Sequence, residues 1–299
     1  MASISLVSPA LATVNINWTS IDNPVNTPDT AVMRVDGTTG YGAVSYAYNI
    51  GTYDVTAAQY VEFLNAKGAS NSAGIYKSIM GTGVYPQGSN IIQSGSSGSY
   101  SYSVSSTYAN MPVVGVTWFD AARFCNWLSN GQGSGSMETG AYTLSGATSG
   151  IIMANAGDQI RLPTEDEWYK AAYYNGASGT YSRFPDGRND VGSADAAYNP
   201  YASGLVNVNY GTPSSYGVYG MGGNVYQWND AVITDTTRGL RGGCWNLDYT
   251  VMQSNLRAHS VPSQNGAYVG FRVASLVPEP TSVILTIFSG GMLLFRRRR

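Results

Sequence analysis

The side chains that most often build catalytic and metal sites are scarce in this sequence. Its 299 residues include 2 cysteines and 1 histidine, and charged residues make up 11 %. Two cysteines are too few for a disulfide framework or a cysteine-rich zinc site. The single histidine, His259, has no second ligand at metal-binding spacing, so the sequence does not support a mononuclear zinc or iron centre. We interpret His259 as a structural or surface residue.

An excess of positive charge is also missing. The net charge is -2, and four of the 16 basic residues form the last four positions, 296–299. The rest of the chain is therefore acidic, and it lacks the basic patch on which nucleic-acid binding depends. Neither a phosphate-binding P-loop nor a G-x-S-x-G nucleophile motif is present. We expect no nucleic-acid partner.

Glycine and tyrosine are abundant instead. The chain holds 36 glycines and 23 tyrosines, and 43 % of its residues are hydrophobic, which favours short strands, many turns and one sizeable core. Alternating residues predict strands at 14–18 and within 40–55, with Gly51 as a turn between strands. Residues 69–110, 130–150 and 175–215 are expected to be long loops or irregular hairpins. No internal repeat is found.

Three helices are predicted from capping boxes, in which a threonine side chain caps the helix and a residue three positions later reaches back. The three pairs are Thr56 with Gln59, Thr117 with Asp120, and Thr164 with Glu167. Helices set among short strands indicate an α+β domain.

The stretch at 216–245 carries the most specific motifs. GMGGNVYQW and LRGGCW are followed by VGFRVAS, and MPVVGVTWFDAARFCNWLS and IRLPTEDEWYKAAYY precede them in order. Together these blocks resemble the formylglycine-generating enzyme (sulfatase-modifying factor) family, over roughly Val14 to Ser275. The resemblance implies a single α+β domain at 13–275, related to C-type lectins.

The resemblance also identifies what is missing. Family members that make formylglycine hold copper(I) between two cysteines shortly after the R-G-G-S-W box, because thiolates select Cu(I). Here Leu247 and Met252 stand at the expected places, with Asp248 between them, and no cysteine follows Cys244. Copper is therefore not expected. The alternative is an oxidase that uses Cys244, which takes the serine position of the box, together with the thioether of Met252.

The other cysteine, Cys125, is predicted to lie on the apolar side of a helix, where a free thiol behaves as a small hydrophobic side chain. A Cys125–Cys244 disulfide in an oxidising compartment is left open by the sequence.

The family's calcium box is partly kept. Gly223, Asn224 and Val225 match it, but Gln227 replaces the glutamate, which removes one negative charge and predicts weaker Ca²⁺ binding.

Two tryptophans and three arginines are predicted to be structural or ligand-binding. Trp228, Arg241, Trp245 and Arg257 are candidates for lining a groove. Trp228 and Trp245 are expected to be buried, and the guanidinium groups of Arg241 and Arg272 to bind carbonyl oxygens of the glycine-rich core.

The two ends of the chain predict export. Residues 1–12 end in Ala10-Leu11-Ala12 and resemble the end of a secretory signal peptide. Residues 276–299 contain VPEP, 15 mostly apolar residues and four arginines, and resemble the PEP-CTERM sorting signal of Gram-negative bacteria. The apolar run is shorter than the roughly 20 residues that span a bilayer. We expect brief membrane insertion and removal by an exosortase-type enzyme; a plain membrane anchor is the alternative.

These observations favour an exported, non-catalytic binding or structural module of the cell envelope, whose protein or glycan ligand the sequence does not identify. A formylglycine-forming oxidase and a carbohydrate-binding surface module remain alternatives; the latter rests on analogy with the fold alone.

Overall fold

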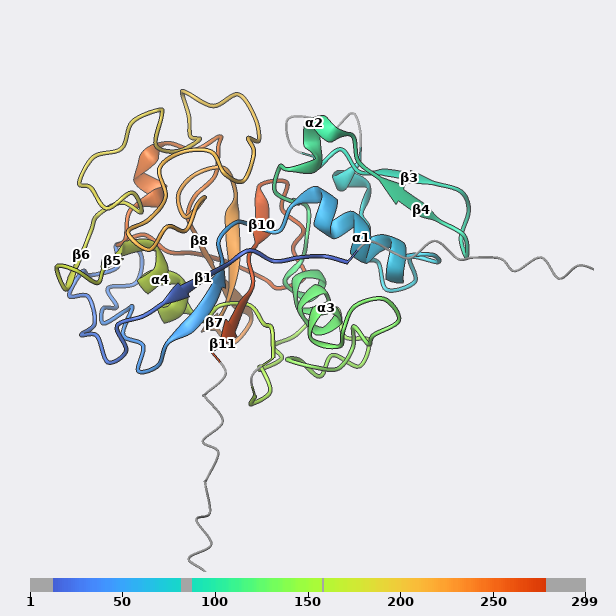
Figure 1. The fold of residues 1–299 in the computed structure, drawn as a ribbon, viewed down its shortest axis with the longest axis horizontal. Coiled ribbons are helices and arrows are strands. Elements are labelled where there is room, and N and C mark those ends of the chain that lie inside the picture. Colours follow the sequence, from blue (N-terminus) through green and yellow to red (C-terminus); the bar gives the residue numbers. More distant parts are fainter. Residues whose placement is uncertain (1–12, 82–87, 158, 278–299) are drawn as a thin grey trace, which may run out of the picture.

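The computed structural model describes residues 13–81, 88–157 and 159–277 (Figure 1). The signal-peptide and sorting-signal expectations fall on residues 1–12 and 278–299, outside this part of the chain. Within the described residues, no helix is both long and apolar enough to cross a membrane.

Short strands and few helices make up the domain. The helices are α1 (Ala57–Lys67), α2 (Ser106–Ala109), α3 (Trp118–Ser129) and α4 (Glu165–Tyr173), with the 3-10 helices η1 (Ser78–Met80) and η2 (Tyr249–Met252). The strands are β1 (Trp18–Ile21), β2 (Tyr48–Gly51), β3 (Ile92–Ser94), β4 (Ser101–Ser103), β5 (Tyr174–Asn175), β6 (Thr180–Tyr181), β7 (Tyr226–Thr234), β8 (Thr237–Arg241), β9 (Ala258–Ser260), β10 (Val269–Phe271) and β11 (Ala274–Leu276). Most of the remaining chain is loop, as expected for an α+β domain of this composition.

Two sheets organise these strands. In the first, β2 lies between β1 and β11 and pairs antiparallel with both, so the beginning and the end of the domain share one sheet. In the second, the order is β10-β7-β8-β9, with β10 parallel to β7 and the other pairs antiparallel. Hairpins β3-β4 and β5-β6 stand apart.

The three predicted helices are confirmed, each with both hydrogen bonds of its capping box. The cap of α1 is Thr56, that of α3 is Thr117 and that of α4 is Thr164. These caps satisfy backbone donors that the first turn of a helix otherwise leaves unpaired.

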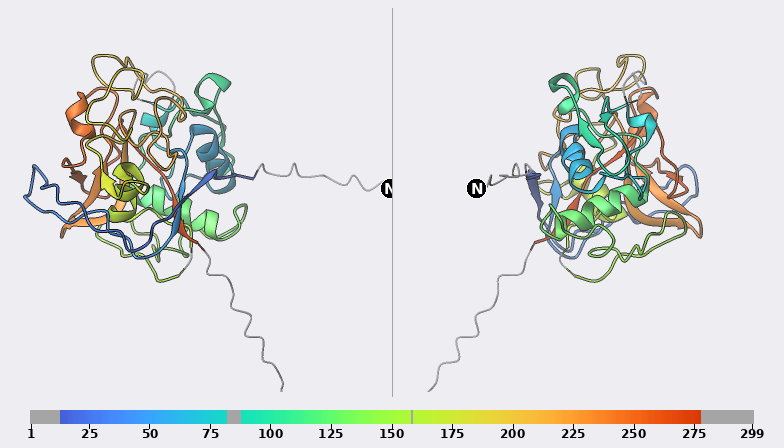
Figure 2. Two further views of the ribbon diagram at one scale, coloured as in Figure 1. Left: turned by 60° about the vertical axis from the view of Figure 1, so that its left-hand side comes forward. Right: turned by 90° about the vertical axis from the view of Figure 1, so that its right-hand side faces the viewer.

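Aromatic side chains of α1 and α3 form the centre of the largest core cluster. The Tyr60 ring stacks on Phe124 with centroids 6.0 Å apart, and Phe63 lies 5.3 Å from Trp127. Phe271 of β10 meets Phe124 edge-on at 5.4 Å. The right panel of Figure 2 shows α1 above α3 in this arrangement. The helices are thereby fixed to the second sheet.

Two strand predictions were wrong in detail. The strand expected at 14–18 instead begins at Trp18 and runs to Ile21, because Ile21 is the buried residue that pairs with Tyr48. Gly51 is not a turn between strands: it ends β2, pairs with Trp18, and donates its amide to the carbonyl of Val273 at 2.8 Å.

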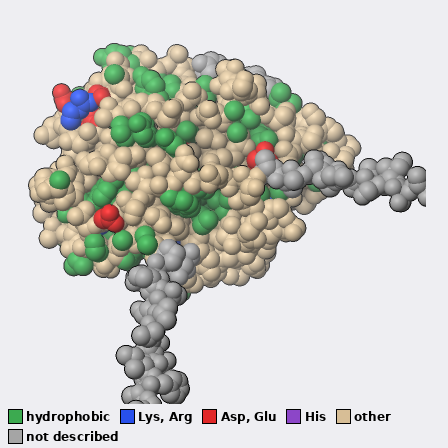
Figure 3. Space-filling model, in the orientation of Figure 1, with side chains coloured by type: hydrophobic (Ala, Val, Ile, Leu, Met, Phe, Trp, Pro, Cys, Tyr) green, Lys and Arg blue, Asp and Glu red, His purple; other side chains and the backbone are tan. Residues whose placement is uncertain are grey.

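The short helix η2 and the end of β11 lie in different parts of the molecule. In Figure 1, η2 is the orange helix in the upper part, whereas β11 ends at the lower edge. The two further views, which are turned about the vertical axis, keep this separation (Figure 2). Charged side chains are sparse on the face drawn in Figure 3.

Candidate functional site

The loop after β8 carries the residues at the family's catalytic positions. Cys244 is buried, and its Sγ donates a hydrogen bond to Oδ1 of Asn246 at 3.1 Å. Burial raises the pKa of the Cys244 thiol to about 12. At neutral pH this thiol is protonated, so it lacks the thiolate character that nucleophiles and copper ligands need.

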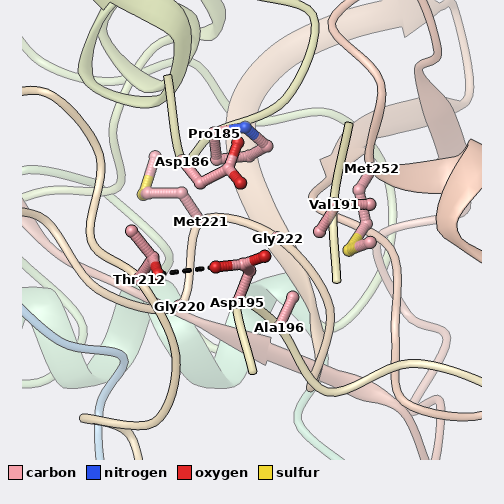
Figure 4. Close-up of a pocket in the computed structure, with 10 residues that line it drawn as sticks. All are labelled: Pro185, Asp186, Val191, Asp195, Ala196, Thr212, Gly220, Met221, Gly222 and Met252. Atoms are coloured by element: carbon pink, nitrogen blue, oxygen red, sulfur yellow. Dashed lines mark hydrogen bonds between the residues drawn. The ribbon is translucent and has the colours of Figure 1, made fainter. Parts of the chain in front are cut away.

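The two positions at which copper-binding members of the family carry cysteines hold other residues in this chain. Leu247 is partly exposed, while Met252 is fully buried at the end of η2. Met252 and Met221 approach a small cavity of about 10 Å³ from opposite sides, with Asp186 and Asp195 beside them (Figure 4). Such a volume holds about one water molecule. The cavity is too small for a substrate side chain.

An arginine bridges the two carboxylates that line this cavity. The Nη2 atom of Arg188 lies 2.8 Å from Oδ2 of Asp186 and also forms an ion pair with Asp195. Thr212 donates its hydroxyl to Asp195 at 2.8 Å. Both carboxylates thus have protein partners, with one guanidinium shared between them.

Cys125 does not approach this region. It lies in α3 within the largest core cluster, and burial raises the pKa of its thiol well above the ordinary range. Both cysteines are free. The Cys125–Cys244 disulfide that the sequence left open is therefore not formed in this structure.

The side chain of Gln227 is occupied by protein partners. Its Oε1 accepts from Trp168 Nε1 at 2.7 Å and from Arg272 Nε at 2.6 Å, while its Nε2 donates to the Gly220 carbonyl at 2.6 Å. An oxygen that carries two donors, one of them cationic, is not offered to Ca²⁺. The Gln227 side chain therefore has a structural role in this conformation, and calcium binding by it stays a prediction.

The other three box residues also make structural contacts. Asn224, at a positive φ of 59°, exchanges two side-chain hydrogen bonds with the backbone of Val206. The Gly223 amide donates to Gly242 at 2.8 Å, and Val225 is fully buried. Among the residues that the structure describes, no group of three or more His, Cys, Asp or Glu could hold a metal ion.

The expected groove of Trp228, Arg241, Trp245 and Arg257 is not formed as such, because two of its members lie inside the core. Trp228 is fully buried and donates its indole N–H to Val116 at 3.1 Å. Arg241 is buried on Glu165 and on two carbonyl oxygens, which confirms its expected role.

The remaining two groove residues lie nearer the surface but face different neighbours. Trp245 meets Tyr268 edge-on with centroids 5.9 Å apart. Arg257 stacks over the ring of Tyr41 at 5.1 Å and forms an ion pair with Asp36. The four residues therefore line no common surface.

A cleft that the sequence did not predict lies over η2. It has a volume of about 390 Å³, within the range of small-molecule sites. Its lining residues are Arg183, Phe184, Asn189, Asp190, Val191, Tyr198, Pro200, Tyr201 and Tyr249. We call this the tyrosine cleft. The loop 183–201 and η2 form it together, and the hydrogen bond from the Asn199 amide to the Leu247 carbonyl at 2.9 Å joins them.

The motif blocks and the fold agree with a comparison of this chain with known protein families. The family model described as "Sulfatase-modifying factor enzyme 1-like domain" matches residues 41–277, well over half of the chain. The chain belongs to this family.

Curated relatives match a little over half of this chain. The serine/threonine-protein kinase pkn1 of Chlamydia pneumoniae is 27 % identical over 186 residues, which cover 56 % of this chain and 24 % of that protein. The "Inactive C-alpha-formylglycine-generating enzyme 2" of Mus musculus is 27 % identical over 187 residues, which cover 57 % of this chain and 51 % of that protein. The chain thus spans about a quarter of the kinase and about half of the mouse protein.

Solved structures of similar fold cover nearly the whole chain. CarF superposes with a TM-score of 0.60 at 21 % identity, covering 89 % of this chain and 100 % of its own. Treponema denticola variable protein 1 gives 0.61 at 20 % identity, with 90 % and 98 % covered. These likenesses confirm the formylglycine-generating-enzyme-like, C-type-lectin-related fold and carry nothing about activity.

Proposed function

We propose that this protein is an exported, non-catalytic binding module of the sulfatase-modifying-factor family, with the tyrosine cleft as its ligand site. The observation that carries the proposal is the chemistry at the family's copper position. Leu247 is an exposed hydrocarbon and Met252 a buried thioether, and neither can supply a thiolate. The fold is kept while the copper ligands are not.

The oxidase alternative requires Cys244 and Met252 to share a copper ion. Cys244 directs its Sγ to Asn246, and Met252 lines the small cavity beneath the loop. The high pKa of the Cys244 thiol also opposes copper(I) capture, since the metal binds the thiolate. The name of the mouse relative, an inactive member of the family, supports the same conclusion.

Export is supported by the sequence at both ends. The small apolar residues at 1–12 and the VPEP, apolar and arginine segments within 276–299 are the pattern of secreted, envelope-sorted proteins. We propose a location at the cell envelope or extracellular surface of a Gram-negative bacterium, with an exosortase-type enzyme as the processing partner.

The test is a turnover assay with purified protein, Cu(I), O₂ and a cysteine-containing sulfatase peptide, read by mass spectrometry. We expect the peptide cysteine to remain unchanged and no stoichiometric Cu(I) binding. A family enzyme with both copper cysteines serves as the positive control. Formylglycine formation that disappears in Cys244→Ser would overturn the proposal and make this protein an enzyme with a rebuilt copper site.

A further inference from the structure

Two exposed tyrosine rings flank a buried one in the tyrosine cleft. Tyr201 is 64 % exposed and Tyr249 45 %, whereas Tyr198 between them is 3 % exposed. Tyr198 meets Tyr201 edge-on with centroids 5.3 Å apart, and meets Tyr249 at 6.3 Å and 70°. The two exposed rings therefore pack against the buried ring of Tyr198, and their apolar faces remain open to the cleft.

The rings are held in place before any ligand arrives. The Tyr201 amide donates to the Tyr198 carbonyl at 2.8 Å. Asp248 caps η2 through the Thr250 amide at 2.7 Å, which fixes the turn that carries Tyr249. Prior order of this kind lowers the entropy lost when a ligand binds.

The cleft also offers polar groups that form no hydrogen bond or ion pair within the described part of the chain. The side chains of Asn189 and Asp190 form no hydrogen bond or ion pair with other described residues, and both are exposed. The guanidinium of Arg183 lies 5.4 Å from the Phe184 ring and has no carboxylate partner among the described residues. Amide, carboxylate and guanidinium together can donate to and accept from a ligand.

A saccharide matches this combination. A pyranose ring has an apolar C–H face, which stacks on an aromatic ring, and an edge of hydroxyl groups, which need both donors and acceptors. The single positive charge of Arg183 and the single negative charge of Asp190 give the cleft no net preference for a charged sugar. An aliphatic ligand would leave these polar groups unpaired.

We propose that the tyrosine cleft binds a neutral hexose-containing saccharide, with one sugar ring stacked on Tyr201 or Tyr249 and its hydroxyl groups on Asn189, Asp190 and Arg183. This inference rests on the proposed binding function and names its ligand class.

The experiment screens the whole chain on an array of neutral and acidic glycans and, in parallel, on a random peptide array, followed by calorimetry with the neutral oligosaccharide bound best. We expect binding to neutral glycans, with at least one of the substitutions Tyr201→Ala and Tyr249→Ala weakening the affinity by about tenfold or more. The matched control is Tyr210→Ala, because Tyr210 is 43 % exposed but lies outside the cleft. Its affinity should equal that of the unaltered protein.

The other outcomes separate the two proposals. Peptide binding lost in Tyr201→Ala, without glycan binding, overturns the saccharide but keeps the binding module. Binding to acidic glycans alone overturns the neutral-ligand assignment, and so does glycan binding unaffected by both cleft substitutions. Absence of binding on both arrays overturns the saccharide, while copper-dependent turnover overturns the binding module itself.

Discussion

Arg272 and Gln227 are joined inside the core, where the Nε of Arg272 donates to Oε1 of Gln227 at 2.6 Å and both side chains are fully buried. Trp168 of α4 donates to the same oxygen at 2.7 Å. The amide of Gln227 therefore links the second sheet, helix α4 and the segment between β10 and β11. It acts as a structural junction at the position where the family has a calcium-box glutamate.

Replacing Gln227→Met should lower the free energy of unfolding by about 3 kcal/mol, because it leaves the buried donors of Arg272 and Trp168 without an acceptor at similar side-chain volume. Chemical denaturation measures the change. Gln264→Met is the control, since Gln264 is exposed, and its effect should stay within about 0.5 kcal/mol. An equal, small effect of both substitutions would show that the junction contributes nothing to stability.

Stability should fall as the pH rises from about 5 to 7, in part through Asp54. Burial raises the pKa of Asp54 from 3.8 to about 7, despite the guanidinium of Arg272 at 3.2 Å, and its Oδ2 has no hydrogen-bond partner. The folded state thus holds a proton that the unfolded state releases, which stabilises the fold at low pH and is lost through pH 7.

Denaturation midpoints between pH 5 and pH 8 test this dependence. Asp54→Asn should reduce the loss of stability with rising pH. The reduction is at most about 1.4 kcal/mol for each pH unit between the ordinary pKa of Asp54, 3.8, and its raised pKa of about 7 in the folded protein. Asp235→Asn, at an exposed position, should keep the original slope. A slope that is unchanged in Asp54→Asn would show that the carboxylate stays charged in the folded protein.

The two tryptophans of the glycine-rich region should differ in their response to phenylalanine. Trp245→Ala should cost roughly 3–5 kcal/mol, since it empties a large buried site. Trp228→Phe should cost more than Trp245→Phe, because the N–H of Trp228 binds Val116 whereas that of Trp245 is buried without a partner. Thermal unfolding of the three variants measures the differences; the reverse order for the phenylalanine pair would contradict this account.

Neither thiol should react with a thiol reagent in the folded protein. Cys125 and Cys244 are both buried and free, and burial raises the pKa of each thiol. Ellman's reagent should therefore detect almost no thiol under native conditions and both thiols in denaturant without reductant. Rapid native labelling that is lost in Cys244→Ser would reveal a reactive thiol and revive the oxidase alternative.

The mature protein should lack the residues beyond about Pro280 if the proposed sorting signal is processed, because VPEP, the apolar run and the arginine cluster resemble such a signal. Intact-mass measurement of protein taken from the native cell envelope tests this. A terminus that still carries Arg296 to Arg299 would favour a plain membrane anchor.

The local parts of the fold could be predicted from the sequence. Thr56, Thr117 and Thr164 cap their helices through residues only three positions away, so a short window contains the whole interaction. The register of β1 could not be predicted, since Ile21 and Tyr48 become partners only when distant segments meet. The motif blocks identified the family because they form the shared core.

The candidate site was less accessible to sequence analysis. Tyr198 lies in a loop, and Tyr249, 51 positions later, lies in the short helix η2. The backbone hydrogen bond between Asn199 and Leu247 joins the two distant segments. Gln227 was expected as a calcium ligand from its place in the motif, and the sequence could not show that Trp168 and Arg272, from other elements, donate to its side-chain oxygen. Sequence identifies residue types well, but not which of their atoms are already occupied.

The separation of η2 from the end of β11 sets how the protein would be displayed. The described chain ends just after β11, at the lower edge of Figure 1, whereas η2, which contributes Tyr249 to the tyrosine cleft, lies in the upper part. A precursor tethered through the proposed anchor would then hold η2 and its Tyr249 apart from the point of attachment. Release by processing would remove this fixed direction without altering the site.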